Sequence, residues 1–225
     1  MPTYSDATIY IVDDDPSVRE ALSWMLRTHR MSNEIFDNAY SFLANIEQTF
    51  ETITSASANS KTQYAAKYPS CLLLDVRMPG MSGIELFNEL LACGLKDSLP
   101  VIFLTGHADL STAVDTVKRG AFDFCEKPFS NNLLVDKIEA ALQVSSVAVA
   151  NMKSLVLFKE RYDMLTDREL SVMYLVTQAL SNKSIGEKLE ISMRTVEVHR
   201  ARIFEKLGVK SAVELTNLLR SKGLV

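Results

Sequence analysis

Residues 71–75 read CLLLD, four apolar residues followed at once by an aspartate. A wholly apolar run of this length is typical of a β-strand covered on both faces, as in a parallel sheet with helices on either side. Two similar runs are TIYIV at residues 8–12 and VIFL at residues 101–104. Each of the three is followed directly by a polar side chain, so we expect buried parallel strands that end in polar groups.

Helical patterns separate these strands. Asp15 and Pro16 are typical of an N-cap and a first helical position, and Ser82-x-x-Glu85 is a capping box that opens another helix. The remaining elements are expected as strands at 35–36 and 121–126 and as helices near 39–44, 110–119 and 131–144. Five strand–helix units predict an α/β fold with a doubly wound, five-stranded parallel sheet. In such a sheet ligands bind at the carboxyl ends of the strands.

Two segments depart from this rhythm. Residues 47–68 are rich in Ser, Thr, Ala and Asn and form an unusually long connection, which we interpret as a mobile insertion before the third strand or as an extension of the preceding helix. Residues 145–160 contain no Pro or Gly and are predicted to form a helical linker, with a flexible hinge as the alternative. The expected domains are therefore residues 1–144, this linker, and residues 161–225.

The two parts of the chain differ in net charge. Residues 1–150 carry 11 Lys and Arg against 19 Asp and Glu, a net charge of −8, whereas residues 151–225 carry 13 against 9, a net of +4. Short helices are predicted at 166–179, 181–189, 192–207 and 211–219, with capping boxes at Thr166-x-x-Glu169 and Ser211-x-x-Glu214 and a plausible N-cap at Ser192. Such helices joined by short turns indicate a small all-α helix-turn-helix domain, and its charge suits a polyanion.

The polar residues at the strand ends make a chemically coherent group. These residues are Asp13, Asp14, Asp75, Thr105 and Lys127. Three carboxylates brought together repel one another and favour a hard cation such as Mg²⁺. A carboxylate beside Mg²⁺ can attack a phosphoryl group, and the lysine and the hydroxyl would contact the phosphoryl oxygens. Taken alone, each residue would be an ordinary surface or turn residue; their joint placement carries the prediction.

Four stretches over about residues 6–143 resemble the successive motifs of the response-regulator receiver domain: IVDDDPSVR, LLLDVRMPGMSG, VIFLTGH and DFCEKPF. The resemblance implies a flavodoxin-like receiver in which Asp75 is the phospho-acceptor and Asp13, Asp14, Asp75 and the Arg77 backbone carbonyl hold Mg²⁺. It also implies that Thr105 and Lys127 contact the phosphoryl oxygens, that Lys127-Pro128 is a cis peptide, and that Phe124 is the aromatic switch residue coupled to Thr105. Phe124 is equally compatible with a core position.

The stretch LTDREL…ALSNKSIGEKLEISMRTVEVHRARIFEKLGVKS resembles the LuxR-type helix-turn-helix of the FixJ and NarL regulators over about residues 162–225. In the helix at 192–207, Val196, Arg200, Ile203 and Leu207 share one face, which we expect to pack inward. Arg200 would extend its guanidinium toward a phosphate. The predicted DNA-binding residues are Lys183, Arg194, Thr195, Glu197, Val198, His199, Ala201 and Arg202. His199 is equally compatible with a structural interface position, and a solvated face is the alternative for the basic side chains of this helix, Lys206 among them.

Together the two resemblances imply a phosphorylation-activated transcriptional regulator of a two-component system. Its implied partners are a sensor histidine kinase, double-stranded promoter DNA, RNA polymerase and a second copy of the chain. It would not be an enzyme beyond Mg²⁺-dependent self-phosphorylation and autodephosphorylation on Asp75. An aspartyl-phosphate phosphatase and a small-molecule-sensing quorum regulator are the alternatives. The N-terminus lacks a signal-peptide pattern, no membrane span is expected, and three widely spaced cysteines favour a reducing, cytoplasmic setting.

Overall fold

The computed structural model describes residues 6–53, 63–106 and 115–224. The chain forms two compact units, Met1–Asn151 and Met152–Val225.

The first unit is built on a five-stranded parallel sheet. Its strands are β1 (Thr8–Val12), β2 (Ser32–Phe36), β5 (Ser70–Asp75), β6 (Val101–Thr105) and β7 (Asp123–Glu126). The spatial order is β2-β1-β5-β6-β7, and every neighbouring pair is parallel. This confirms the predicted doubly wound sheet, in which the strand order reverses beside β1.

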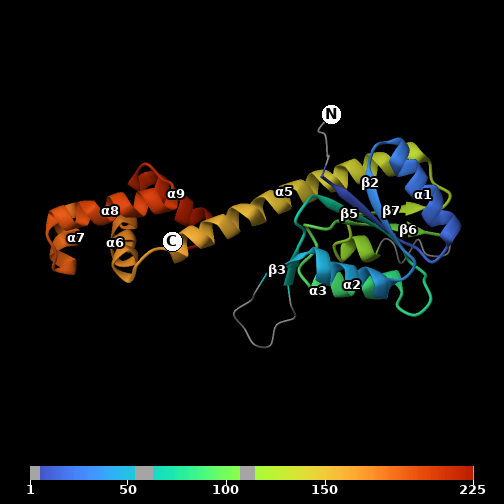
Figure 1. The fold of residues 1–225 in the computed structure, drawn as a ribbon, viewed down its shortest axis with the longest axis horizontal. Helices are drawn as coiled ribbons and strands as arrows, with labels where there is room; N and C mark the ends of the chain where they lie inside the picture. The colour runs from blue at the N-terminus through green and yellow to red at the C-terminus, as the bar shows by residue number, and fades with distance from the viewer. Residues whose placement is uncertain (1–5, 54–62, 107–114, 225) are drawn as a thin grey trace. The chain divides into compact units, whose positions relative to one another are not determined.

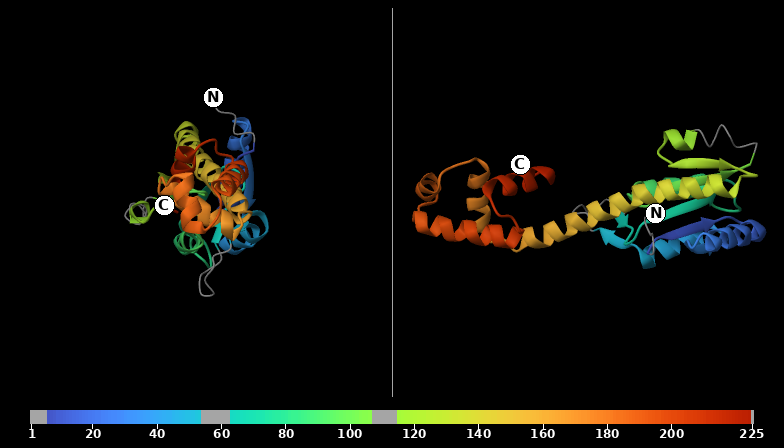
Figure 2. Two further views of the ribbon diagram at one scale, coloured as in Figure 1. Left: turned by 90° about the vertical axis from the view of Figure 1, so that its left-hand side faces the viewer. Right: turned by 90° about the horizontal axis from the view of Figure 1, so that it is seen from above.

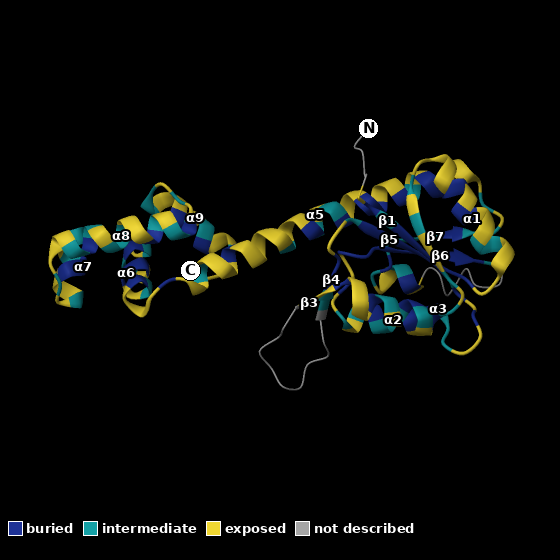
Figure 3. Ribbon diagram, viewed as in Figure 1, coloured by how far each residue is buried: buried dark blue, intermediate teal, exposed yellow. Residues whose placement is uncertain are grey.

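Helices cover both faces of the sheet (Figures 1 and 2). Helices α1 (Pro16–Thr28) and α5 (Asn131–Asp163) lie on one face, where Leu22 and Leu26 of α1 and Leu134 and Ile138 of α5 share a buried cluster. Helices α2 (Ala39–Thr49) and α3 (Gly83–Ala92) lie on the other, with Phe42 and Phe87 in a second cluster. The three central strands are almost wholly buried between these layers (Figure 3).

The strand register aligns one residue from each strand in a row across the sheet. Phe36, Val12, Leu74, Phe103 and Phe124 are successive register partners, and all belong to or pack against the cluster on the α2 and α3 face. The residue after Val12 is Asp13, which directly follows β1, and the residue after Leu74 is Asp75, the last residue of β5. Because the strands are parallel, these polar residues reach the same edge of the sheet.

The long connection at residues 47–68 is more ordered at its ends than the sequence suggested. Helix α2 continues to Thr49, and β3 (Glu51–Ile53) pairs antiparallel with β4 (Gln63–Ala65). The Tyr64 amide also donates to the carbonyl of Cys93, at the end of α3, over 3.1 Å. Residues 54–62, the middle of the predicted mobile insertion at 47–68, lie outside the described residues. The predicted helix at 110–119 is likewise described only from residue 115, and residues 115–118 are helical.

Helix α5 runs without a break from Asn131 to Asp163 and so includes residues 145–160. By length and composition it could cross a membrane, with a mean hydropathy of 1.4 over 18 residues, contrary to the expectation that the sequence holds no such stretch. Its first half nevertheless packs against the sheet, where Leu134, Ile138, Ala141 and Leu142 are completely buried. Apolar residues of α5 thus form part of the core of the first unit.

The second unit is entirely helical within the described residues. After the end of α5 come α6 (Asp167–Thr177), α7 (Asn182–Leu189), α8 (Met193–Leu207) and α9 (Ala212–Ser221). Phe158 and Tyr162 of α5 pack against this unit's core, which includes Val172, Ile185 and Leu215. The α-helical domain predicted from the sequence is therefore present.

Hydrogen bonds at the helix ends confirm two of the predicted caps in the second unit. Thr166 and Glu169 form a complete capping box, and the Ser192 side chain caps α8. The predicted box at Ser211 is only half formed, because the Glu214 carboxylate accepts from the Lys210 amide at 2.8 Å. Gly208 ends α8 with φ +70, a backbone conformation that favours glycine.

Ser145 is a fully buried hydroxyl on the face of α5 that meets the sheet. Its Oγ accepts from the Ser70 amide at 2.8 Å and donates to the Ser98 carbonyl at 2.6 Å. Because both contacts join segments far apart in the sequence, this hydroxyl ties α5 to the start of β5 and to the loop before β6.

We expect Ser145→Ala to lower the free energy of unfolding of the first unit by about 1–3 kcal/mol, since the buried Ser70 amide loses its acceptor. Urea unfolding of the full chain measures the change. Ser146→Ala, at the half-buried neighbouring position, should stay within about 0.5 kcal/mol of the parent. Equal, small effects of the two changes would show that the Ser145 contacts add nothing.

Candidate functional site

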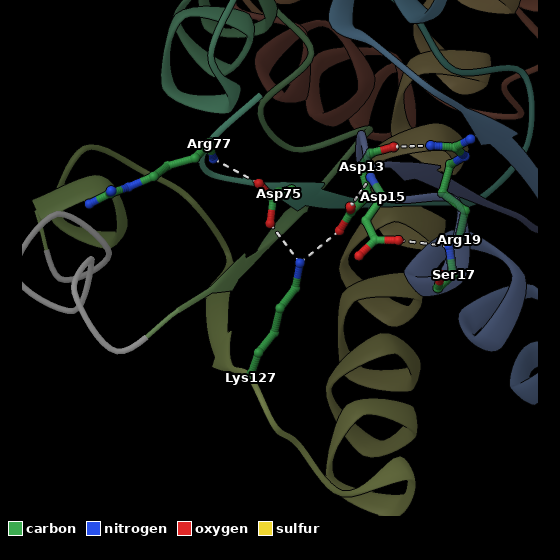
Figure 4. Close-up of polar contacts among 7 residues, drawn as sticks. All are labelled: Asp13, Asp15, Ser17, Arg19, Asp75, Arg77 and Lys127. Atoms are coloured by element: carbon green, nitrogen blue, oxygen red, sulfur yellow. Dashed lines mark hydrogen bonds and ion pairs between the residues drawn. The ribbon is translucent and has the colours of Figure 1, made fainter. Parts of the chain in front are cut away.

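A lysine ammonium joins two carboxylates at the carboxyl edge of the sheet (Figure 4). Lys127 Nζ lies 2.7 Å from Asp13 Oδ2 and 2.6 Å from Asp75 Oδ1. Asp13 directly follows β1, Asp75 is the last residue of β5, and Lys127 directly follows β7. The parallel sheet therefore brings together three of the five polar residues that the sequence placed at the strand ends.

Backbone amides hold the second oxygen of each carboxylate. Asp13 Oδ1 accepts from the Asp15 amide at 2.9 Å, and Asp75 Oδ2 accepts from the Arg77 amide at 2.8 Å. Arg19 Nη1 donates to the Asp13 carbonyl at 2.7 Å, which anchors α1 beside the site (Figure 4). Both carboxylates are thus oriented by the chain itself, with one oxygen of each turned to the lysine.

Burial and charge act in opposite directions on these groups. Burial raises the pKa of Asp75, although Lys127 and the Arg77 amide pull the other way. Burial acts to lower the pKa of Lys127, but its contacts with Asp13 and Asp75 outweigh this and raise it. The lysine is consequently held as a cation beside a carboxylate that is more basic than an exposed aspartate, a combination suited to attack on an anionic group.

Thr105 ends β6 next to this edge and is completely buried. Its carbonyl accepts from the Lys127 amide at 2.7 Å. Its Oγ1 is buried and has no hydrogen-bond partner among the described residues. Since an unmade hydrogen bond in a buried position is costly, the hydroxyl is suited to a ligand that brings its own acceptor oxygen.

Asp14 is exposed and does not share the lysine. Within the described part of the chain no three His, Cys, Asp or Glu side chains converge on a common metal position. The donor set still fits Mg²⁺, because this ion needs only one or two carboxylates and fills its other positions with water and substrate oxygens. Asp75 and the neighbouring Asp13 and Asp14, which follow β1, are the carboxylates available to it.

Two further sequence-predicted features of this region can be located. The Lys127-Pro128 peptide is cis, as predicted. Phe124 on β7 is half-buried and packs against the cluster that contains Phe103. Phe124 therefore makes the contacts expected of a core residue. Its role as a switch residue stays a prediction.

Gly83 was missed by the sequence reasoning as a site residue. It is the first residue of α3, and a Cβ at this position would lie 2.0 Å from the Asp75 carbonyl oxygen. Its amide donates to the Val76 carbonyl at 3.1 Å. The glycine therefore lets the start of α3 press directly against the backbone of Asp75. The motif MSG, in which a glycine directly follows the capping Ser82, was the sequence signal for this close approach.

In the second unit, the predicted inward face of α8 is confirmed for Val196, Ile203 and Leu207, which are buried. The predicted DNA-binding residues divide by exposure. Lys183, Arg194, Val198, Ala201 and Arg202 are exposed, and Thr195, Glu197 and His199 are half-buried. Thr195 Oγ1 lies 2.8 Å from the capping Ser192 Oγ, and Arg194 forms a 3.5 Å ion pair with Glu197. The ring nitrogen Nδ1 of His199 is buried and has no partner among the described residues.

Two basic side chains of α8 contact neighbouring helices. Arg200 Nη1 donates to Asn182 Oδ1 at 2.8 Å, and its guanidinium lies over the Phe204 ring; its extension toward a phosphate stays a prediction. Lys206 Nζ lies 2.7 Å from the buried Glu169 carboxylate and donates to the Met164 carbonyl at 2.9 Å. Burial acts to raise the pKa of Glu169, but Lys206 and Thr166 outweigh this and lower it. The two residues tie α8 to α7 and α6.

Comparison with known proteins finds similarity over both units. The sequence matches the family models described as "Response regulator receiver domain" over residues 9–139 and "Bacterial regulatory proteins, luxR family" over residues 163–219. It is 36% identical to the C4-dicarboxylate transport transcriptional regulatory protein DctR of Rhodobacter capsulatus, over 94% of this chain and 98% of that protein. It is 35% identical to the transcriptional regulatory protein FixJ of Rhizobium meliloti (strain 1021), over 97% and 98%. The solved structure of the response regulator StyR is 36% identical and aligns with a TM-score of 0.77, over 96% of this chain and 98% of that one.

Gly83→Ala should displace Asp75 and destabilise the first unit by about 1–3 kcal/mol, because the added methyl group meets a backbone oxygen that cannot move aside. Thermal unfolding and phosphoryl uptake from acetyl phosphate would be measured together, and both should fall. Gly106→Ala is the control, since a Cβ there meets no described atom within 4 Å. A Gly83→Ala protein that matches the parent in both assays would show that the close approach is unimportant.

Lys206→Ala should lower the free energy of unfolding of the second unit by about 1–3 kcal/mol, because the buried Glu169 carboxylate loses its charged partner. Calorimetry of the full chain measures this. Arg202→Ala, at an exposed position on the same helix, should leave stability within about 0.5 kcal/mol but weaken DNA binding. Unchanged stability in Lys206→Ala, with weakened DNA binding, would instead assign Lys206 to the DNA contact.

Proposed function

The chain belongs to the two-component response regulators that join a receiver domain to a LuxR-family DNA-binding domain, and on that premise we propose that phosphorylation of Asp75 controls its binding to promoter DNA. The receiver would occupy residues 1–144 with its insertion at 47–68, the linker 145–160, and the DNA-binding domain 161–225. As in the regulators it resembles, the chain acts in transcription regulation.

The observation that carries this proposal is the position of Lys127 between Asp13 and Asp75. In the proposed step, an Asp75 carboxylate oxygen attacks the phosphorus of a phosphohistidine on the sensor kinase. The new O–P bond forms as the P–N bond breaks, and the imidazole leaves. The geometry supports this because the Arg77 amide fixes one Asp75 oxygen while the other faces the lysine.

The new phosphoryl oxygens would find partners already in place. Lys127 can transfer its contact from the Asp75 carboxylate to a phosphoryl oxygen, and the unpartnered Thr105 hydroxyl can donate to another. Asp13, Asp14, Asp75 and the Arg77 carbonyl would hold Mg²⁺. When bound, this ion would neutralise charge on the transferring group. The same groups would support self-phosphorylation and autodephosphorylation on Asp75.

The output would follow from a two-state change in the first unit. Movement of Thr105 toward the phosphoryl group would free space for Phe124 and favour a homodimer through the surface around β7. A homodimer would place two DNA-binding units on adjacent half-sites and present the complex to RNA polymerase. The proposed setting is the cytoplasm. A small-molecule-sensing regulator, the alternative class, would need a different N-terminal half from the receiver domain matched over residues 9–139.

Asp75→Asn should abolish phosphoryl uptake from acetyl phosphate and Mg²⁺, because the amide keeps the shape of the side chain but is not a nucleophile. Intact-mass spectrometry would show one added phosphoryl group on the parent and none on the variant. Asp97→Asn, at an exposed position after α3, is the matched control and should behave as the parent. Phosphoryl uptake at parental stoichiometry by Asp75→Asn would refute the assignment.

A further inference from the structure

The exposed face of α8 has an apolar centre. Val198 is 41% exposed and Ala201, one helical turn further on, is also exposed. Arg194 and Arg202 lie four residues before and four residues after Val198 and are exposed as well. Residues three or four apart lie on the same side of a helix, so the face presents an apolar patch between two arginines.

Two other cations of α8 are engaged by neighbouring helices. Arg200 is bound to Asn182, and Lys206 is bound to Glu169 and the Met164 carbonyl. Arg194 is partly neutralised by its ion pair with Glu197. A helix with four basic side chains in the sequence therefore presents a centre that offers an apolar contact in place of a charged one.

Val198 has no evident structural reason to be valine. Its side chain is exposed and is not part of the hydrophobic cluster of the second unit, whereas Val196, two residues earlier, is completely buried. A β-branched residue also favours a helix less than alanine does, by a few tenths of a kcal/mol. The side chain is therefore available for contact with a partner at no loss to packing.

DNA offers one apolar group in the major groove, the C5 methyl of thymine, and small apolar side chains are its usual partners. We infer that Val198 recognises a thymine methyl group, that the small Ala201 lets the helix approach the base closely, and that each half-site carries an A·T pair beneath Val198. This inference rests on the proposed role of α8 as the recognition helix. It names a base pair that this protein selects and the residue that selects it.

The test uses the full chain activated with beryllofluoride and the tightest-binding duplex recovered from a randomised library. Each thymine is replaced in turn by deoxyuridine, which lacks only the methyl group. Replacement at one position in each half-site should weaken binding of the parent protein about fourfold relative to the unmodified duplex. This factor is equivalent to about 0.8 kcal/mol, the value for one buried methyl group. Val198→Ala should bind the thymine duplex about fourfold more weakly than the parent and lose nothing further with deoxyuridine.

Val213→Ala is the matched control, because Val213 is an exposed valine on α9. It should keep the parental penalty for deoxyuridine. Val198→Ala should melt no lower than the parent, so that weaker binding cannot come from unfolding. Affinity that is insensitive to every deoxyuridine, or a penalty that persists in Val198→Ala, overturns the inference alone. A selection that recovers no preferred duplex overturns the proposed function and the inference together.

Discussion

The structure of the first unit depends on one electrostatic arrangement, in which a single ammonium group satisfies two carboxylates at the edge of a parallel sheet. Without Lys127, Asp13 and Asp75 would lie close together with no cation between them, and one of them is almost fully buried. The sheet register makes this arrangement possible, because the row from Phe36 to Phe124 places the strand ends level with one another. The apolar core and the charged site are two consequences of the same alignment.

In the proposed function, the site would hold a reactive carboxylate in a folded chain. One oxygen of Asp75 is fixed by a backbone amide, and the other is held by a lysine that can exchange this contact for a phosphoryl oxygen. The buried Thr105 hydroxyl has no partner among the described residues and would be a second contact for the phosphoryl group. Phosphorylation would then give the Thr105 hydroxyl the hydrogen-bond partner that it lacks in the unmodified site.

In the second unit the basic side chains have separate roles. Arg200 and Lys206 stabilise the packing of α8 against α7 and α6, and Arg194 and Arg202 stay on the exposed surface. Net positive charge therefore overstates how much of this helix is available to a phosphate backbone. Recognition of DNA would rely more on shape and on apolar contact than the count of lysines and arginines indicates.

The sequence alone determined the five parallel strands, most helix bounds and the residues at the strand ends, because apolar runs, capping residues and glycines act over a few neighbouring positions. The receiver and helix-turn-helix resemblances predicted the roles of these residues. Only the tertiary structure decided that Lys127 contacts Asp13 and not Asp14, that Gly83 presses against Asp75, that β3 and β4 pair, and that Arg200 and Lys206 are internal contacts. Each of these joins residues separated by between 8 and 114 positions, and such pairings depend on how elements pack, which no local pattern records.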